Sequence, residues 1–351
     1  MRRPTLCTLV ALLALGSCRE PAGELPTLGA AGDGISVSGI SAGAYMAGQF
    51  QIAHSRQVIG AAIIAGGPYG CAKSVFADIM PGPGTVFLNM AKAVNGCMQN
   101  GLALWGIPNE SQLARDAEAL ARADRIDPIA SVRDDRVYLY SGRNDHTVAG
   151  PIVAAAAAFY RKLGVADSAI RLVEDGPAGH AFVTETEGLA CGATGPPYLN
   201  DCDYDQAGEL LKHILGPLQT PAPNAGGRYV EFDQTAFTTG LVAPGLATRG
   251  MVYVPKSCAT EPGCRIHIAF HGCGQSLDSI GDIFVKGTGF GRWADSNRLI
   301  VLFPQVRSTP LNFQACWDWW GYTGQDYLSR TAPQITAVHR MVEQLAASAG
   351  Y

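Results

Sequence analysis

The chain has 351 residues, of which 47% are hydrophobic and only 16% are charged, and its formal net charge is −4. This composition supplies enough apolar side chains for a large core and excludes an intrinsically disordered chain. There is no basic block and no phosphate-binding glycine loop, so nucleic acid is not expected as a partner.

The first residues have the composition of an export signal. Arg2 and Arg3 precede an apolar run, residues 5–15, that is too short to span a bilayer as a helix. The run ends in Leu15-Gly16-Ser17-Cys18, which resembles a bacterial lipobox, in which the cysteine is acylated. Residues 1–18 are therefore predicted to be a lipoprotein signal peptide, with lipidation at Cys18 and location in the cell envelope. The alternative is an ordinary secretory signal, cleaved between residues 16 and 22, and a secreted protein.

Eight cysteines follow this signal, an even number that indicates disulfides in an exported chain. No Cys-x-x-Cys pair occurs, so a zinc site is not suggested. Connectivity does not follow from sequence alone. Short-loop pairing predicts four bonds: Cys71–Cys97, Cys191–Cys202, Cys258–Cys264 and Cys273–Cys316.

A Gly-x-Ser-x-Gly pentapeptide, residues 39–43, ends a predicted strand that begins at residue 34, and a predicted helix follows over residues 44–54. In this strand–turn–helix context the serine stands at the tip of a sharp turn, where glycines leave room for close packing. A chance match is not rare in a chain with 42 glycines, so the flanking elements carry the inference. Ser41 is predicted to be a nucleophile.

An acid and a base follow two later strands. Asp145 lies beyond a predicted strand over residues 136–140, and His180 lies on a glycine-flanked loop beyond a strand over residues 169–173. The order Ser41, Asp145, His180 is that of α/β-hydrolases, whose triad side chains follow the carboxyl ends of strands. The open alternatives are Asp134, Asp135 or Asp175 as the acid and His146 as the base.

Hydrophobic patterns predict the remaining elements. Residues 250–255 and 265–270 are interpreted as neighbouring strands joined by a cysteine-bearing turn. The other predicted elements are strands over residues 58–65 and 299–304 and helices over residues 111–123, 151–163 and 333–347.

A His-Gly-x-Gly segment, residues 271–274, is typical of the oxyanion loop of esterases, but it lies about 230 residues after the nucleophile instead of before it. If the chain is followed from residue 228 to 351 and then from residue 25, the elements take the usual α/β-hydrolase order. We therefore predict a single-domain, circularly permuted α/β-hydrolase over residues 25–351 with a mostly parallel central sheet. The Gly/Pro-rich residues 215–227 would link the two permuted halves rather than separate two domains. Residues near 28 and 350 should lie close together.

Five motifs in this permuted order resemble those of the poly(3-hydroxybutyrate) depolymerases, whose catalytic domain is a circularly permuted α/β-hydrolase. The resemblance implies that Ser41 is the nucleophile, His180 the base and Asp145 its orienting acid. It also implies an oxyanion hole formed by the backbone N–H groups of Ala42 and Cys273, and a Cys273–Cys316 disulfide. Many members carry a separate polymer-binding domain, which is not expected here. The motifs are residues 39–43, 142–145, 179–182, 270–275 and 316–319.

Three tryptophans, Trp317, Trp319 and Trp320, lie within four residues. Aromatic residues beside a cysteine usually belong to the core, but three so close together do not easily all point inward. Trp319 and Trp320 are therefore the candidates for substrate binding. Neither the spacing of His267 and His271 nor the acidic residues 201–205 match a metal site, so no metal or cofactor is expected.

The sequence thus predicts a serine esterase that hydrolyses a poly(3-hydroxybutyrate)-type polyester or its oligomers through an acyl-enzyme. One alternative is an esterase for other acyl esters, such as feruloyl or acetyl groups on polysaccharide. Another is a surface lipoprotein that binds without cleaving, which the complete set of triad candidates disfavours. No sequence feature indicates an oligomeric state.

Overall fold

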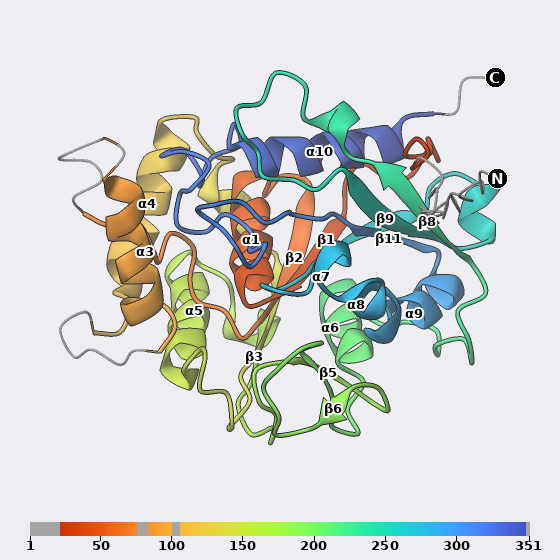
Figure 1. Ribbon diagram of the computed structural model, residues 1–351, viewed down its shortest axis with the longest axis horizontal. Helices are drawn as coiled ribbons and strands as arrows, with labels where there is room; N and C mark the ends of the chain where they lie inside the picture. Colours follow the sequence, from red (N-terminus) through yellow and green to blue (C-terminus); the bar gives the residue numbers. More distant parts are fainter. Residues whose placement is uncertain (1–21, 76–81, 83, 100–105, 349–351) are drawn as a thin grey trace, which may run out of the picture.

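The computed structural model describes residues 22–75, 82, 84–99 and 106–348. The predicted signal peptide and Cys18 lie outside these residues. A mixed eight-stranded sheet stands at the centre of the described residues, and helices cover both of its faces (Figure 1). In the described part of the chain, no helix has the length and apolar character needed to cross a membrane.

The strands are β1 (Ile35–Ile40), β2 (Val58–Ile64), β3 (Arg136–Tyr140), β4 (Ile170–Val173), β5 (Phe182–Thr184), β6 (Leu189–Ala190), β7 (Leu199–Asp201), β8 (Arg228–Asp233), β9 (Arg249–Val254), β10 (Arg265–Phe270) and β11 (Leu299–Phe303). The α-helices are α1 (Ala42–Ala53), α3 (Thr85–Gly96), α4 (Glu110–Arg122), α5 (Gly150–Lys162), α6 (Gln206–Leu215), α7 (Leu277–Ile280), α8 (Ile283–Gly287), α9 (Phe290–Asn297) and α10 (Pro333–Ala346). Short 3₁₀ turns are η1 (Ile129–Val132), η2 (Asp167–Ala169), η3 (Thr235–Phe237) and η4 (Ser257–Ala259).

The large sheet has the order β4-β3-β2-β1-β10-β11-β9-β8, so the four strands before residue 174 form one side of the sheet and the four strands after residue 227 form the other. The six strands β4, β3, β2, β1, β10 and β11 pair in parallel with their neighbours in this order. Strand β9 pairs antiparallel with both β11 and β8. The prediction of a mostly parallel sheet is therefore confirmed. The central contact between the two halves is the parallel pair of β1 and β10.

The interpretation of residues 250–255 and 265–270 as neighbouring strands is wrong, because β11 lies between β9 and β10. The segment that joins them, residues 255–264, is longer than a typical hairpin turn of about two to five residues. It includes the turn η4 and the Cys258–Cys264 disulfide, and it carries the chain past one strand. Hydrophobic patterning identified both strands as buried but does not specify which strands pair.

The two ends of the described chain meet. The amide of Leu28 donates to the carbonyl of Leu345 over 3.2 Å, and that of Gly29 donates to the carbonyl of Ala347 over 3.0 Å. The expected approach of the residues near 28 and 350 is confirmed for these positions.

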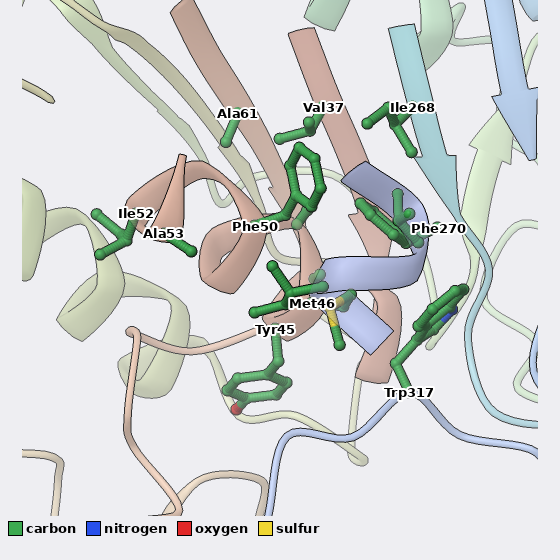
Figure 2. Packing of buried hydrophobic residues seen from close by; sticks show 14 of the residues in the cluster. Val37, Tyr45, Met46, Phe50, Ile52, Ala53, Ala61, Ile268, Phe270 and Trp317 are labelled. Carbon is green, nitrogen blue, oxygen red and sulfur yellow. The ribbon is translucent and has the colours of Figure 1, made fainter. Parts of the chain in front are cut away.

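Each sheet face has its own apolar core. Along β11, Ile300 and Leu302 face α1, α5 and α10, whereas Val301 and Phe303 face α6, α8 and α9. Burial on both faces explains why the interior strands are continuous apolar runs. Figure 2 shows α1 lying on the first of these cores, with Phe50 directed toward the strands.

Candidate active site

Ser41 stands at a sharp turn between β1 and α1, with φ 56° and ψ −123°. This positive φ is unfavourable for a residue with a side chain, and such strain is typical of functional sites. Both glycines of the motif are required for packing. A Cβ on Gly39 would lie 2.1 Å from the carbonyl oxygen of Gly43, and one on Gly43 would lie 2.3 Å from that of Phe270. The turn therefore has the geometry of a nucleophile elbow.

Asp145 and His180 are joined by a hydrogen bond of 2.8 Å between Oδ2 and Nδ1. The other carboxylate oxygen, Oδ1, accepts from the amides of Thr147 and Val148 over 2.8 and 2.9 Å. The amide of His180 donates to Thr194 Oγ1 over 2.9 Å. These bonds fix the rotamer of Asp145 and the loop of His180. Among the described residues, Nε2 of the imidazole has no hydrogen-bond partner.

The alternative acids and base lie elsewhere. Asp134, Asp175 and His146 are exposed to solvent. Asp135 is buried at the start of β3, at the opposite end of the strand from Asp145, and it accepts from Gln51 Nε2 over 2.7 Å. Among the four carboxylates considered, Asp145 is the one that contacts His180.

Asp135 makes stability depend on pH. Burial raises the pKa of its carboxyl to about 8, so the folded chain keeps a proton that the unfolded chain loses near its ordinary value of 3.8. Its contribution to the free energy of unfolding is therefore fully present below about pH 4 and is lost as pH rises toward about 8.

Asp135→Asn keeps an acceptor for Gln51 but removes the titration. We expect the free energy of unfolding of wild type, relative to that of the variant, to fall by about 1 kcal/mol per pH unit between pH 5 and 7. Urea unfolding at several pH values measures this difference, and other titrating groups cancel in it. Parallel stability curves for the two proteins would contradict the assignment.

Ser41 and His180 line one cavity of about 220 Å³, together with Thr147, Tyr198 and Gln275. The described residues contain no hydrogen bond between the Ser41 hydroxyl and the His180 ring. Such bonds are often long without substrate and tighten in the substrate complex. The arrangement therefore brings the three triad candidates to one edge of the sheet, where β1, β3 and β4 end.

Two backbone amides beside Ser41 are candidates for an oxyanion hole. Ala42 opens α1, and Cys273 follows β10 and lines the same cavity as Ser41. In the described part of the chain, neither amide donates to another protein group. His271, two residues before Cys273, is fully buried and its Nδ1 lies 2.7 Å from the carbonyl of Gly272. Burial lowers the pKa of this histidine to about 4. It is thus a neutral structural residue of the loop.

The described residues form four disulfides, and these have the four predicted pairings. One of them, Cys273–Cys316, ties the predicted oxyanion loop to the tryptophan segment over a sequence separation of 43. The side chain of Asn312 holds the same segment, accepting from the amide of Cys316 over 2.8 Å and donating to its carbonyl over 2.7 Å.

Replacing Cys273 and Cys316 together by serine should lower kcat about tenfold or more, because displacing one oxyanion donor costs up to about 10²- to 10³-fold. The matched control is Cys258→Ser with Cys264→Ser, which removes a disulfide far from Ser41 and should leave kcat unchanged. Steady-state kinetics on a soluble ester tests this. Equal kcat losses in both double variants would show a general effect of lost stability.

A second cavity, of about 200 Å³, opens beside Ser41 and is almost entirely apolar. Trp319 and Trp320 line it, and Trp319 stacks on Tyr45 with ring centroids 4.0 Å apart. Trp317 is instead fully buried against Phe270, at a centroid distance of 4.9 Å (Figure 2). All three tryptophans are buried in the same apolar core, contrary to the expectation that they would not all point inward, and Trp319 and Trp320 also form part of the cavity wall.

Comparisons with known proteins identify the family of the chain. No family model matches the chain. A poly(3-hydroxybutyrate) depolymerase from Delftia acidovorans is 34% identical over 346 residues, which are 97% of this chain and 65% of that protein. A polyhydroxybutyrate depolymerase from Talaromyces funiculosus is 32% identical over 358 residues, covering 95% of this chain and 96% of the relative. The chain belongs to the poly(3-hydroxybutyrate) depolymerase family.

Solved structures support the same family. The crystal structure of PHB depolymerase from Penicillium funiculosum superposes with a TM-score of 0.80 at 29% identity, covering 92% of this chain and 98% of that chain. A serine-to-alanine variant of a PHB depolymerase, complexed with an R3HB trimer, gives the same values. These matches confirm the predicted α/β-hydrolase type of fold and place the chain among carboxylic ester hydrolases. The chain spans 65% of the length of the Delftia relative.

Part of the wall of the apolar cavity beside Ser41 was not predicted. Met90 and Val94 of α3 line the apolar cavity, and so do Leu311 and Phe313, which precede the tryptophan segment. The residues of α3 are mostly apolar. This apolar composition was the one sequence signal that could have indicated a helix with an exposed apolar surface. The loop residues 311 and 313 have no comparable pattern.

Proposed function

We propose that this protein is a serine esterase that hydrolyses poly(3-hydroxybutyrate)-type polyesters or their oligomers through an acyl-enzyme intermediate. The observation that supports this most strongly is the hydrogen-bonded Asp145–His180 pair, whose histidine lines the same cavity as the elbow serine, Ser41. A second support is the apolar cavity that begins at Ser41.

In the first half of the reaction, Ser41 Oγ attacks the ester carbonyl carbon while His180 Nε2 accepts its proton. Asp145 holds the Nδ1–H of the imidazole and stabilises the imidazolium. The tetrahedral oxyanion accepts hydrogen bonds from the amides of Ala42 and Cys273. Collapse breaks the ester C–O bond, and His180 returns the proton to the departing alkoxide.

In the second half, His180 accepts a proton from water, which attacks the acyl carbon bound to Ser41. The second tetrahedral intermediate uses the same two amides. Its collapse breaks the bond to Ser41 Oγ, which regains its proton, and releases the carboxylic acid. No bound cofactor is needed for these steps.

The polyester assignment is supported by the chemistry of the apolar cavity. A 3-hydroxybutyrate chain carries one methyl branch and one ester per unit, so it suits a groove with apolar walls and hydrogen-bond donors at the reacting ester. Trp319 and Trp320 are proposed to contact the substrate there. A related PHB depolymerase was solved as a complex with an R3HB trimer.

We further propose that residues 25–351 form one catalytic domain, with residues 215–227 as its linker. Export is supported by the four disulfides, which form in oxidising compartments. The signal peptide would be cleaved before Cys18, which would become the N-terminus and carry a lipid in the cell envelope.

Clearing of an amorphous poly(3-hydroxybutyrate) suspension tests the substrate class, beside assays with a soluble short-chain ester and a feruloyl ester. We expect clearing and release of soluble hydroxy acids. Cleavage of the soluble ester without clearing would restrict the function to oligomers or short esters. Preference for the feruloyl ester would overturn the polyester assignment.

A further inference from the structure

Gln275 lies at the end of the oxyanion loop and is 1% exposed. Its Oε1 accepts from the amide of Gly272 over 2.7 Å. Its Nε2 donates to the carbonyls of Pro197 and Tyr198 over 3.0 and 3.1 Å. Both N–H groups and the oxygen of this amide are therefore engaged, and they connect two segments about 75 residues apart in sequence.

At one end, Gln275 shapes the turn that presents the Cys273 amide. The backbone amide of Gln275 closes the turn by donating to the carbonyl of Gly272 over 3.3 Å. The backbone amide of Gly274 donates to the carbonyl of Gln314 over 2.7 Å. The side-chain oxygen of Gln275 accepts the hydrogen bond of the Gly272 backbone amide. Cys273 therefore contributes the amide of this turn that has no protein acceptor among the described residues.

At the other end, Gln275 holds the segment of Pro197 and Tyr198, which packs against His180. The ring of Tyr198 meets the His180 ring edge-on, with centroids 6.5 Å apart and planes at 79°. Tyr198 has φ 56°, a strained conformation that persists only where its surroundings hold it. Its carbonyl accepts from Gln275 and also from the amide of Phe182, two residues beyond His180.

We propose that Gln275 is a positioning residue that fixes the oxyanion loop relative to the segment packed on His180. This proposal rests on the proposed function, because it acts through the donor at Cys273 and the base at His180. Loss of the amide would leave buried backbone groups unpaired and let the two segments shift. Since one oxyanion donor contributes about 10²- to 10³-fold to kcat, a displaced donor should cost about 10- to 100-fold.

Gln275→Glu tests the proposal through pH. An ionised carboxylate still accepts from Gly272 but is repelled by the carbonyls of Pro197 and Tyr198, whereas a protonated carboxyl can donate to one of them. On a soluble short-chain ester we expect kcat about 10- to 100-fold below wild type at pH 8, with KM changed less than about threefold. The ratio of variant to wild-type kcat should rise as pH falls toward 5.

A matched control is Gln234→Glu. The Gln234 side chain is also fully buried, donates to the carbonyls of Ala247 and Gln305 over 2.8 and 2.9 Å and accepts from the amide of Gln305 over 2.9 Å. It lies outside both cavities beside Ser41. This control should lose stability but keep kcat, with rates normalised to sites titrated by an organophosphonate.

Gln275→Asn is a second variant, neutral but one methylene too short to reach both segments. It should lower kcat without recovery at low pH, which keeps the test decisive if the glutamate variant does not fold. Wild-type kcat in either Gln275 variant, a loss confined to KM, or an equal loss in Gln234→Glu would overturn the proposal. Failure of the proposed function would appear separately, as full activity of Ser41→Ala.

Discussion

Ser41→Ala is expected to lower turnover of a soluble ester by about four to six orders of magnitude, because the acyl-enzyme can no longer form. KM should change little, since alanine leaves the cavity walls intact. The residual rate reflects the oxyanion donors and binding alone. Steady-state kinetics with enough enzyme to detect the remaining turnover makes this measurement.

Ser36→Ala is the matched control for this variant. Ser36 lies on β1, the strand that leads to Ser41, and bonds to the buried ring of His267 over 2.8 Å, away from the reacting atoms. Its replacement should reduce stability but keep kcat. If Ser41→Ala kept more than about a tenth of wild-type turnover, another nucleophile would carry the reaction.

Asp145→Asn is expected to lower kcat by about four orders of magnitude with the fold intact. An asparagine amide can donate to His180 Nδ1, which would place the proton on Nε2 and prevent that nitrogen from accepting one from Ser41. The same neutral residue cannot stabilise the imidazolium. Kinetics on the soluble ester, with the melting temperature as a check on folding, tests this role.

Asp175→Asn gives a matched comparison, because Asp175 is an exposed acid beyond the neighbouring strand β4. It should retain wild-type kcat. A large loss of kcat in Asp175→Asn together with a small loss in Asp145→Asn would show that Asp145 is not the triad acid.

The elbow and the strand exits could be predicted because each leaves a local pattern. Gly39 and Gly43 are required by contacts as close as 2.1 and 2.3 Å, so the motif itself encodes the packing. The runs that became β2, β3 and β11 are apolar because both of their faces are buried. The permuted order of the elements could be predicted because the His-Gly-x-Gly segment, residues 271–274, follows the nucleophile motif in the sequence instead of preceding it.

Other features had no local pattern. The small sheet β5-β7-β6 consists of strands of two or three residues, too short for a periodic signal. The separation of β9 from β10 by β11 depends on pairing, which hydrophobicity does not encode. Gln275 gives no sign of its role, because its partners Pro197 and Tyr198 are brought to it only by the fold.

The most direct test of the account is to trap the covalent intermediate. The enzyme is mixed with an (R)-3-hydroxybutyrate trimer, quenched in acid and digested, and the peptide that contains Ser41 is examined by mass spectrometry. The account predicts a peptide carrying one or more hydroxybutyryl units on Ser41 in wild type and none in Ser41→Ala. An unmodified Ser41 peptide during rapid turnover, or the same acyl group on another residue, would contradict it.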